Sequence, residues 1–277
     1  MSKGLSESDQ KLTVEISAKR YNKGVLESNT ISLAREVPYT LFVNDREILS
    51  MATLPSSLNE LFVGFMVSEG ILSSPSEIIE CVVDHPNRLA RLELDVPESR
   101  LEKLERKGML TSGCAGGLVF SVETQASPTD SEQIRPVLDL SPSTVLNRMR
   151  ELDTFPGTYS TTRGVHAASV ADENKTIRIL EDLGRHNAVD KIVGYCVLNQ
   201  IDTADKLLLT TGRITSEVLT KTARGGFPIV ISRSSASAMA VGMARQSRID
   251  VITYVRAGRF NYFPHGSTNM EFNSGEI

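Results

Sequence analysis

The sequence predicts a mixed α/β protein in which a β-rich N-terminal domain precedes an α/β domain. Near the C-terminus, three short apolar runs at 206–210, 228–231 and 249–254 alternate with helical stretches at 215–224 and 236–246. That order of strand and helix is typical of a parallel sheet with right-handed crossover connections. Earlier segments alternate apolar and polar residues, which is the period of half-buried strands. The chain of 277 residues is long enough for two domains of about 150 residues each.

A stretch rich in Ser, Thr, Pro and acidic residues marks the expected domain boundary, because such composition is typical of linkers. We expect a disordered N-terminus at 1–11, a β-rich domain at 12–124, a linker at 125–135 and the α/β domain at 136–277. The first domain is expected to end in a loop around Cys114.

Turn and cap residues separate the elements of the first domain. Asn44-Asp45 turns a hairpin, and Gly70 ends the helix that follows it. A charged helix opens on Pro97 and ends at Gly108, the usual placement of proline and glycine. The expected strands are 12–18, 37–43, 47–53, 81–83 and 89–96, and the expected helices are 58–66 and 97–107.

The second domain begins with a helix at Ser141-Pro142, with Ser as the N-cap and Pro at the first helical position. A hairpin of 166–170 and 176–180 follows. The three apolar runs described above then supply the strands of the parallel sheet.

Composition excludes several classes of function. The net charge of −4 gives no global attraction to nucleic acid or to an anionic membrane. No apolar run approaches the roughly 20 residues of a membrane span, and the polar start lacks the apolar core of a signal peptide. The three cysteines, Cys81, Cys114 and Cys196, are too widely spaced to indicate a disulfide framework. A reducing cytoplasm is therefore the expected location.

Cys114 lies in the loop Thr111-Ser112-Gly113-Cys114-Ala115-Gly116-Gly117, where no bulky side chain would shield its sulfur. Glycine allows close approach of another molecule, and access decides whether a thiolate reacts. This pattern indicates an exposed, reactive thiol. The alternative is a small buried side chain in a tight turn, since free cysteine is often buried.

Arginine and small residues follow each of the three expected parallel strands, at Gly212-Arg213, Arg233-Ser234-Ser235 and 256–259. Ligands of open α/β sheets bind beyond the carboxyl ends of the strands. Two of these turns lead into helix N-termini, which favour anions, and guanidinium groups match phosphate bidentately. The strand ends therefore predict a site for a phosphorylated ligand. The alternative is that each arginine is simply solvated.

The segment 181–191, Glu-Asp-Leu-Gly-Arg-His-Asn-Ala-Val-Asp-Lys, concentrates ionisable groups at a junction between a strand and a helix. A structural network of ion pairs is its first interpretation. In the second, Arg185 and His186 bind an anionic ligand or keep a nearby thiol ionised. No partners are evident for His166 and His265, so surface or core roles are expected for both.

Spacing argues against two kinds of catalytic site. A zinc nucleobase deaminase needs His-x-Glu and Pro-Cys-x-x-Cys segments, and the sequence has neither. No Walker-type phosphate loop occurs either, so nucleotide hydrolysis is not indicated.

Five separate motifs resemble one known family, the FdhD accessory sulfurtransferases needed to make active formate dehydrogenase, over about 36–264 of the chain. They are Glu69-Gly70-Ile71, Thr111-Ser112-Gly113-Cys114, the whole of 181–191, Thr211-Gly212-Arg213 with Glu217 and Lys221, and Val255-Arg256-Ala257-Gly258-Arg259. The resemblance implies a cytidine-deaminase-like three-layer fold for the second domain, without its zinc, and a homodimer.

The resemblance also implies a function. Such proteins take sulfur as a persulfide from a cysteine desulfurase. They pass it to the molybdenum or tungsten bis-guanine-dinucleotide cofactor of formate dehydrogenase, which a guanine nucleotide mimics. The implied cofactor-binding residues are Tyr254, Val255, Arg256, Ala257, Gly258 and Arg259. The roles of Arg185, His186, Arg213, Glu217 and Lys221 stay open, as do the choice of metal and the dehydrogenase served.

One departure from the family pattern concerns the loop. Most relatives carry Cys-x-x-Cys there, whereas this chain has Gly117 at the second position. Cys114 matches the cysteine to which the family assigns the persulfide, so a catalytic role is expected for it, while Cys81 and Cys196 are interpreted as structural. The alternative function is a non-catalytic binding protein that delivers the cofactor without sulfur transfer.

Overall fold

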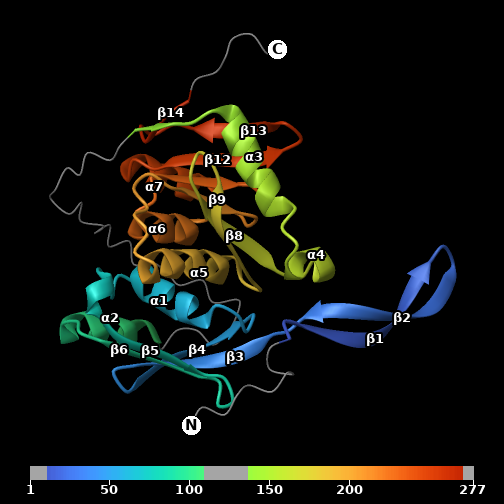
Figure 1. The fold of residues 1–277 in the computed structure, drawn as a ribbon, viewed down its shortest axis with the longest axis horizontal. Helices are drawn as coiled ribbons and strands as arrows, with labels where there is room; N and C mark the ends of the chain where they lie inside the picture. Colours follow the sequence, from blue (N-terminus) through green and yellow to red (C-terminus); the bar gives the residue numbers. More distant parts are fainter. Residues whose placement is uncertain (1–10, 109–136, 271–277) are drawn as a thin grey trace.

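Two mixed β-sheets, one from each half of the chain, form the frame of the protein (Figure 1). The computed structural model describes residues 11–108 and 137–270. Its mixture of helices and sheets confirms the mixed α/β class. The expected linker at 125–135 and the Cys114 loop lie outside the described residues. The likeness of the second half to cytidine deaminases stays a prediction.

The sheet of the N-terminal half has four strands in the order β4-β3-β6-β5. Strand β3 pairs antiparallel with β4 and parallel with β6, and β5 pairs antiparallel with β6. The bounds are Val37–Val43 (β3), Arg46–Thr53 (β4), Ile78–Asp84 (β5) and Leu89–Leu94 (β6), with a 3-10 turn, η1, at Pro75–Glu77.

The sheet of the C-terminal half has six strands in the order β13-β12-β11-β10-β8-β9. Strands β10, β11 and β12 are parallel, as the three apolar runs predict, and the other pairs are antiparallel. The bounds are His166–Ala171 (β8), Thr176–Asp182 (β9), Leu207–Thr210 (β10), Ile229–Ser232 (β11), Asp250–Arg256 (β12) and Arg259–Phe263 (β13). A small parallel pair joins β7 (Leu138–Asp139) to β14 (Thr268–Asn269).

Helices lie on both faces of this second sheet, with α5 on one face and α3 on the other. Seven are described: Leu58–Ser68 (α1), Glu98–Gly108 (α2), Pro142–Asp153 (α3), Thr158–Thr162 (α4), Arg185–Leu198 (α5), Ser216–Arg224 (α6) and Ala238–Gln246 (α7). In the described part of the chain no helix is long and apolar enough to cross a membrane.

Alternate side chains of the parallel strands face two different helical layers. Leu208, Val230 and Val251 pack with α1, α5 and the first sheet in one core. Leu207 and Ile229 belong to a second core with α3 on the opposite face. Helix α1 lies between the four-stranded sheet and α5, so the first core is continuous across the two halves (Figure 1).

Helices α1 and α5 cross with their backbones in contact. A Cβ on Gly64 of α1 would collide with the carbonyl oxygen of Asp190, and a Cβ on Gly194 of α5 would collide with that of Glu60. Each glycine also lies against the other's backbone nitrogen, at 2.7 Å from the position of the added Cβ. Because any side chain would separate the helices, these two glycines fix the distance between the two halves.

Local signals account for several element boundaries. Asn44 and Asp45 adopt φ values of 47° and 62°, which suit the two-residue hairpin turn that the sequence predicts there. The hydroxyl of Ser141 accepts a hydrogen bond from the Thr144 amide at 3.1 Å and caps α3, with Pro142 at its first position. The prediction of a helix start at Ser141-Pro142 is confirmed.

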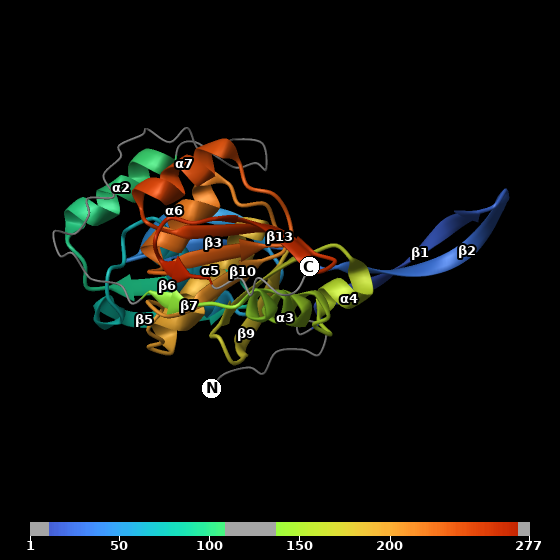
Figure 2. The same cartoon turned by 90° about the horizontal axis from the view of Figure 1, so that it is seen from above.

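A long two-stranded ribbon, which we call the arm, projects from the body (Figures 1 and 2). It consists of β1 (Thr13–Asn22) and β2 (Val25–Ala34), paired antiparallel along their whole length. The sequence predicts β1 as a half-buried strand, but most of its side chains are exposed. An alternation of apolar and polar residues indicates a strand with one apolar face. It does not indicate whether another part of the same chain covers that face.

Candidate anion-binding site

The loops that follow β10, β11 and β12 lie side by side at one edge of the six-stranded sheet. Ile214 forms a parallel bridge with Ala236, and the Tyr254 amide donates to the carbonyl oxygen of Ser234 at 2.9 Å. The strand ends are adjacent because the three strands pair in parallel. The topology therefore brings Arg213, Arg233 and the segment 254–259 to the same edge, as the sequence predicts.

Three guanidinium groups lie near enough to one histidine at this edge to affect its pKa. Burial lowers the pKa of His166, and the positive charges of Arg185, Arg233 and Arg213 lower it further. The sequence gives His166 no functional part, yet it begins β8, the antiparallel neighbour of β10. A cluster of cations that disfavours another positive charge favours an anion by the same interaction.

A cavity of about 360 Å³ opens beside His166. On one side it contains Tyr159, whose ring lies under two guanidinium groups, those of Arg163 at 4.9 Å and Arg233 at 5.9 Å. Arg233 also donates to Asp153 at 3.1 Å, so part of its charge is already paired. The cavity is lined by Tyr159, Arg163, Gly164, Val165, His166, Leu183, Thr211 and Arg233.

Arg185 is a cation of the edge with free hydrogen-bonding capacity. Its Nε is buried and has no hydrogen-bond partner among the described residues. A Cβ on Gly212 would lie 2.7 Å from the Cβ of Arg185, so the glycine after β10 makes room for this side chain. Arg185 opens α5, whose N-cap Gly184 provides no side-chain cap, and such helix starts favour anions.

The carboxylate of Glu181 positions Tyr159. It accepts hydrogen bonds from the backbone amides of Thr158 at 2.6 Å and Tyr159 at 2.9 Å, which lie in the first turn of α4. An acidic group suits the positive end of a helix. Strand β9 thereby holds the short helix that supplies one wall of the cavity.

The next residue, Asp182, binds the fully buried Lys191 at 2.6 Å. Lys191 also donates to the carbonyl oxygens of Leu54 at 3.1 Å and Glu181 at 3.0 Å. Asp182 accepts further hydrogen bonds from the hydroxyl of Thr53 and from Asn187. The interpretation of 181–191 as a structural ion-pair network is confirmed for this pair.

A second buried pair joins Asp190 to Lys221, with 2.8 Å between the oxygen and the nitrogen. The hydroxyl of Ser68 at the end of α1 donates to Asp190 at 2.5 Å. Burial raises the pKa of Asp190, while the charge of Lys221 acts in the opposite direction. Lys221 is therefore a structural cation here and no part of the cavity wall.

His186 lies between the buried pairs and the edge. Its Nε2 is 3.3 Å from a carboxylate oxygen of Glu217 and 3.4 Å from the Thr215 hydroxyl. Burial, followed by the charges of Arg185 and Lys221, lowers the pKa of His186 to about 3. Burial raises the pKa of Glu217. The imidazole is thus neutral at neutral pH and adds no positive charge.

The segment 254–259 forms the end of β12 and the turn into β13. Tyr254 has a φ of 56° at an irregularity between Thr253 and Arg256, and the turn itself uses Ala257 and Gly258 at 50° and 74°. The Arg256 guanidinium lies 5.5 Å from the centre of the Tyr254 ring. Val255 is 1% exposed and belongs to the core, whereas Tyr254, Arg256, Ala257, Gly258 and Arg259 are exposed.

The two described cysteines are poor nucleophiles. Burial, helped by the negative charges of Glu60 and Glu80, raises the pKa of Cys81 to about 12. Burial likewise raises the pKa of Cys196 to about 12. Cys114 lies outside the described residues.

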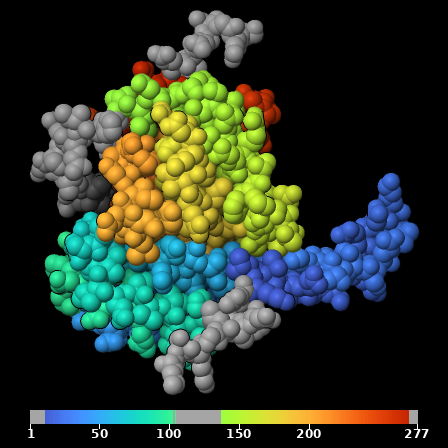
Figure 3. Space-filling view, viewed as in Figure 1, coloured from blue at the N-terminus to red at the C-terminus, as the bar shows by residue number. Residues whose placement is uncertain are grey.

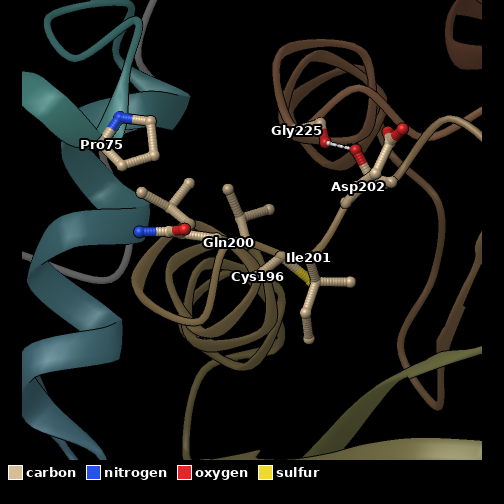
Figure 4. A pocket seen from close by; sticks show the side chains of 9 residues that line it. Pro75, Cys196, Gln200, Ile201, Asp202 and Gly225 are labelled. Carbon is tan, nitrogen blue, oxygen red and sulfur yellow. Dashed lines mark hydrogen bonds between the residues drawn. The ribbon is translucent and has the colours of Figure 1, made fainter.

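A second cavity, of about 330 Å³, lies between η1 and the end of α5 (Figure 4). Its lining includes no basic side chain, and its Thr203 hydroxyl already donates to the carbonyl oxygen of Gly225 at 2.7 Å. It is lined by Pro75, Val193, Cys196, Val197, Gln200, Ile201, Asp202, Thr203 and Gly225. The sheet edge is therefore the candidate site for an anion. No group of three metal-binding side chains occurs within 11–108 and 137–270.

The fold and the edge together define a mixed α/β protein with a cationic cavity at the ends of its parallel strands. The model of the FdhD/NarQ family matches residues 34–269, and the chain belongs to this family. The sulfur carrier protein FdhD of Bacillus subtilis (strain 168) is 34% identical over 259 residues, which are 93% of this chain and 97% of that protein.

Two further relatives support the assignment. The sulfur carrier protein FdhD of Staphylococcus aureus (strain Newman) is 31% identical over 246 residues, covering 89% of this chain and 92% of that protein. A crystal structure from Desulfotalea psychrophila, of a protein proposed to be a formate dehydrogenase accessory protein, has a TM-score of 0.72. It is 27% identical and covers 92% of this chain and 97% of that one.

Proposed function

We propose that this protein is a sulfur carrier that loads sulfur as a persulfide on Cys114 and passes it to the bis-guanine-dinucleotide cofactor of a formate dehydrogenase. The cationic sheet edge is the observation that carries this proposal, because parallel pairing brings Arg213 and Arg233 together beside the cavity, and Arg185 acts with them on the pKa of His166. A dinucleotide cofactor presents pyrophosphate groups, and guanidinium groups bind phosphate oxygens in pairs. The sulfur-carrying part of the proposal is supported by the relatives, which are named sulfur carrier proteins.

The choice of Cys114 is supported by the state of the other thiols. With a pKa of about 12, roughly one thiol in 100,000 is ionised at pH 7, and the thiolate is the reactive form. In the proposed loading step, the Cys114 thiolate attacks the sulfane sulfur of a desulfurase persulfide, and the desulfurase thiolate leaves. Gly117 in place of a second cysteine means that no disulfide within the loop assists the release of sulfur.

The cofactor would enter as a substrate at the arginine-lined strand ends. Arg185, Arg213 and Arg233 would bind its phosphate groups, and the exposed hairpin with Arg256 and Arg259 would extend the same cationic surface. Their chemistry fits an anionic dinucleotide, because one guanidinium nitrogen at the edge is buried without a partner among the described residues. A cysteine desulfurase, the catalytic subunit of formate dehydrogenase and a cytoplasmic location complete the proposal.

Radiolabelled sulfur tests the carrier role. After incubation with a cysteine desulfurase and labelled cysteine, the protein is expected to carry label that a thiol reductant releases. Cys114→Ala should abolish labelling, while Cys81→Ser and Cys196→Ala, the matched controls, should retain it. Labelling of Cys114→Ala at the wild-type level would exclude Cys114 as the carrier.

The second candidate function is a binding protein that delivers the cofactor without sulfur transfer, which the Gly117 replacement favours. Restoration of formate dehydrogenase activity in cells that lack the native protein separates the two. A sulfur carrier requires Cys114 for restoration, whereas a delivery protein tolerates Cys114→Ala and loses function only when the edge arginines are replaced.

A further inference from the structure

Asp153 is the last residue of α3, a position that disfavours an acidic side chain. The carboxyl end of a helix carries partial negative charge, which repels a carboxylate. Met149 and Leu152 of the same helix are buried in the second core and hold the end of α3 in place. The yellow-green residues of α3 and α4 form one side of the body in the space-filling view (Figure 3). A carboxylate fixed at this position needs a cation from another element to offset its cost.

Arg233, from the loop after β11, supplies that cation. Its Nη1 lies 3.1 Å from a carboxylate oxygen of Asp153, and its Nη2 lies 3.5 Å from the hydroxyl of Tyr159. The Arg233 amide donates to the carbonyl oxygen of Thr210 at 3.3 Å, so the backbone that carries this side chain is held by β10. Arg233 also lines the cavity. One guanidinium group therefore contacts an internal carboxylate and belongs to the candidate anion site.

The pair of Asp153 and Arg233 differs from the buried pairs of the junction. The side chains of Asp182 and Lys191 are fully buried, whereas those of Asp153 and Arg233 are 27% and 36% exposed. Among the described residues, Arg233 is the only hydrogen-bond partner of the Asp153 carboxylate.

This pair adds little to the stability of the fold. Burial raises the pKa of Asp153, and the charge of Arg233 acts in the opposite direction without cancelling that rise. Partly exposed ion pairs contribute about 0–1 kcal/mol. Stability alone therefore does not explain why a carboxylate stands beside a cavity that is otherwise cationic.

A carboxylate and a phosphate group compete for the same guanidinium donors. Both accept charge-assisted hydrogen bonds from arginine, and a bound phosphate must take Arg233 from Asp153 or share it. The negative charge of Asp153 also repels an anion that enters the cavity. The site should therefore bind an anion less tightly than its arginines alone would allow. Differences of this kind between variants of one site appear mostly in the dissociation rate.

We propose that Asp153 is an internal competitor for Arg233, which weakens anion binding in the cavity and so favours release of the ligand. Because the competition concerns the proposed anion site, the inference rests on the proposed function and describes its regulation. A carrier has to pass its ligand on, and a moderate affinity serves that step. The displaced carboxylate keeps contact with water, since its side chain is partly exposed.

Calorimetric titration of the full chain with inorganic pyrophosphate at low salt tests the proposal. Asp153→Asn keeps the shape and an acceptor oxygen but removes the charge, so the affinity should rise about fivefold, the equivalent of one partly exposed ion pair. A purely structural role for Asp153 predicts a loss of affinity instead. The matched control, Asp45→Asn, removes one negative charge beside Arg91 on the first sheet and should bind as the wild type does.

A double-mutant cycle shows whether Asp153 acts through Arg233. In a protein that already carries Arg233→Gln, Asp153→Asn should give no comparable gain, because the cation under competition is gone. An equal gain in both backgrounds would overturn the proposal.

The same titrations separate this inference from the proposed anion site. Pyrophosphate binding by the wild type that is equal to or tighter than binding by Asp153→Asn would overturn the competition and leave the anion site in place. Absence of binding in both proteins would overturn the anion site together with the competition. Binding by Asp153→Asn alone would support both.

Discussion

Charged residues serve opposite purposes in two neighbouring regions of the molecule. At the junction where α1 crosses α5, Lys191 and Lys221 are buried, and each contacts a carboxylate, Asp182 and Asp190 respectively. At the sheet edge, less than two turns of α5 before Lys191, Arg185 has a buried Nε with no partner among the described residues. Both regions draw on the same segment, 181–191.

The difference separates charged residues that stabilise the fold from charged residues that are able to bind a ligand. A buried charge with a full set of hydrogen bonds contributes to a defined arrangement of the chain and has no capacity left for a ligand. A cation with unsatisfied donors gains most when an anion arrives. The junction therefore holds the two halves together, and the edge is the region that we propose as the anion-binding site. Each of the following changes tests one side of this contrast.

The largest effect is expected from Gly64→Val at the helix crossing. The new side chain would collide with the backbone of α5, so the helices must separate and the core between them must open. The free energy of unfolding should fall by more than about 4 kcal/mol, measured by denaturant titration. Gly242→Ala in α7, where a Cβ meets open space, should instead raise it by about 0.5–1 kcal/mol.

Lys191→Met is expected to have the next largest effect. It leaves the Asp182 carboxylate buried without its counter-charge, which should cost about 3–5 kcal/mol in chemical denaturation. Lys206→Met is the matched control, because Lys206 pairs with Asp205, a neighbour that is half exposed, and its effect should stay below about 1 kcal/mol. Equal losses of unfolding free energy in Lys191→Met and Lys206→Met would contradict the distinction between the buried junction and the surface.

Arg233→Gln should affect binding with little change in stability. Calorimetric titration with inorganic pyrophosphate at low salt should show about a tenfold loss of affinity, because one guanidinium contact is removed. Arg91→Gln on the first sheet, whose guanidinium lies over Phe42, should bind as the wild type does. Unchanged binding in Arg233→Gln would place the anion elsewhere, and the pair Arg256→Ala with Arg259→Ala would then be the next test.

The smallest expected effect is the change in stability between pH 7 and pH 6. Because the pKa of His186 falls from about 6.5 to about 3 on folding, the unfolded chain binds a proton between these values and the folded chain does not. Stability therefore decreases as the pH falls from 6.5, by at most about 1.4 kcal/mol per pH unit for this group. The raised pKa of Glu217 acts in the opposite direction, and it is present in the wild type and in His186→Gln. The difference between these two proteins in the pH dependence of the unfolding free energy, measured by denaturant titration, therefore isolates the contribution of the histidine.

Much of the fold is readable from local patterns. The Asn44-Asp45 turn, the Ser141 cap and the three apolar runs each act over a few neighbouring residues, and the structure has all of them. The placement of Arg213 and Arg233 follows from topology, since loops after adjacent parallel strands must meet at one edge.

Other features have no local signal. Tyr159, Arg163 and His166 reach the cavity from α4 and β8, far along the chain from the arginine-bearing loops, so no pattern links them. Gly64 and Gly194 lie inside helices, where a glycine usually lowers helix stability. Their presence is explained only by the close contact of the two crossing helices, which no local pattern predicts. Strand β2 escapes prediction because the polar run Glu27-Ser28-Asn29-Thr30 interrupts its alternation.

Glu181 and Asp182 are consecutive residues of β9, and their side chains project from opposite faces of the strand. Glu181 accepts hydrogen bonds from the amides at the start of α4. Asp182 forms an ion pair with Lys191 of α5. A displacement of this strand would therefore move the contact with α4 and the contact with Lys191 together. The buried lysine of α5 and the tyrosine wall of the cavity therefore have one strand as their common support, through two adjoining carboxylates.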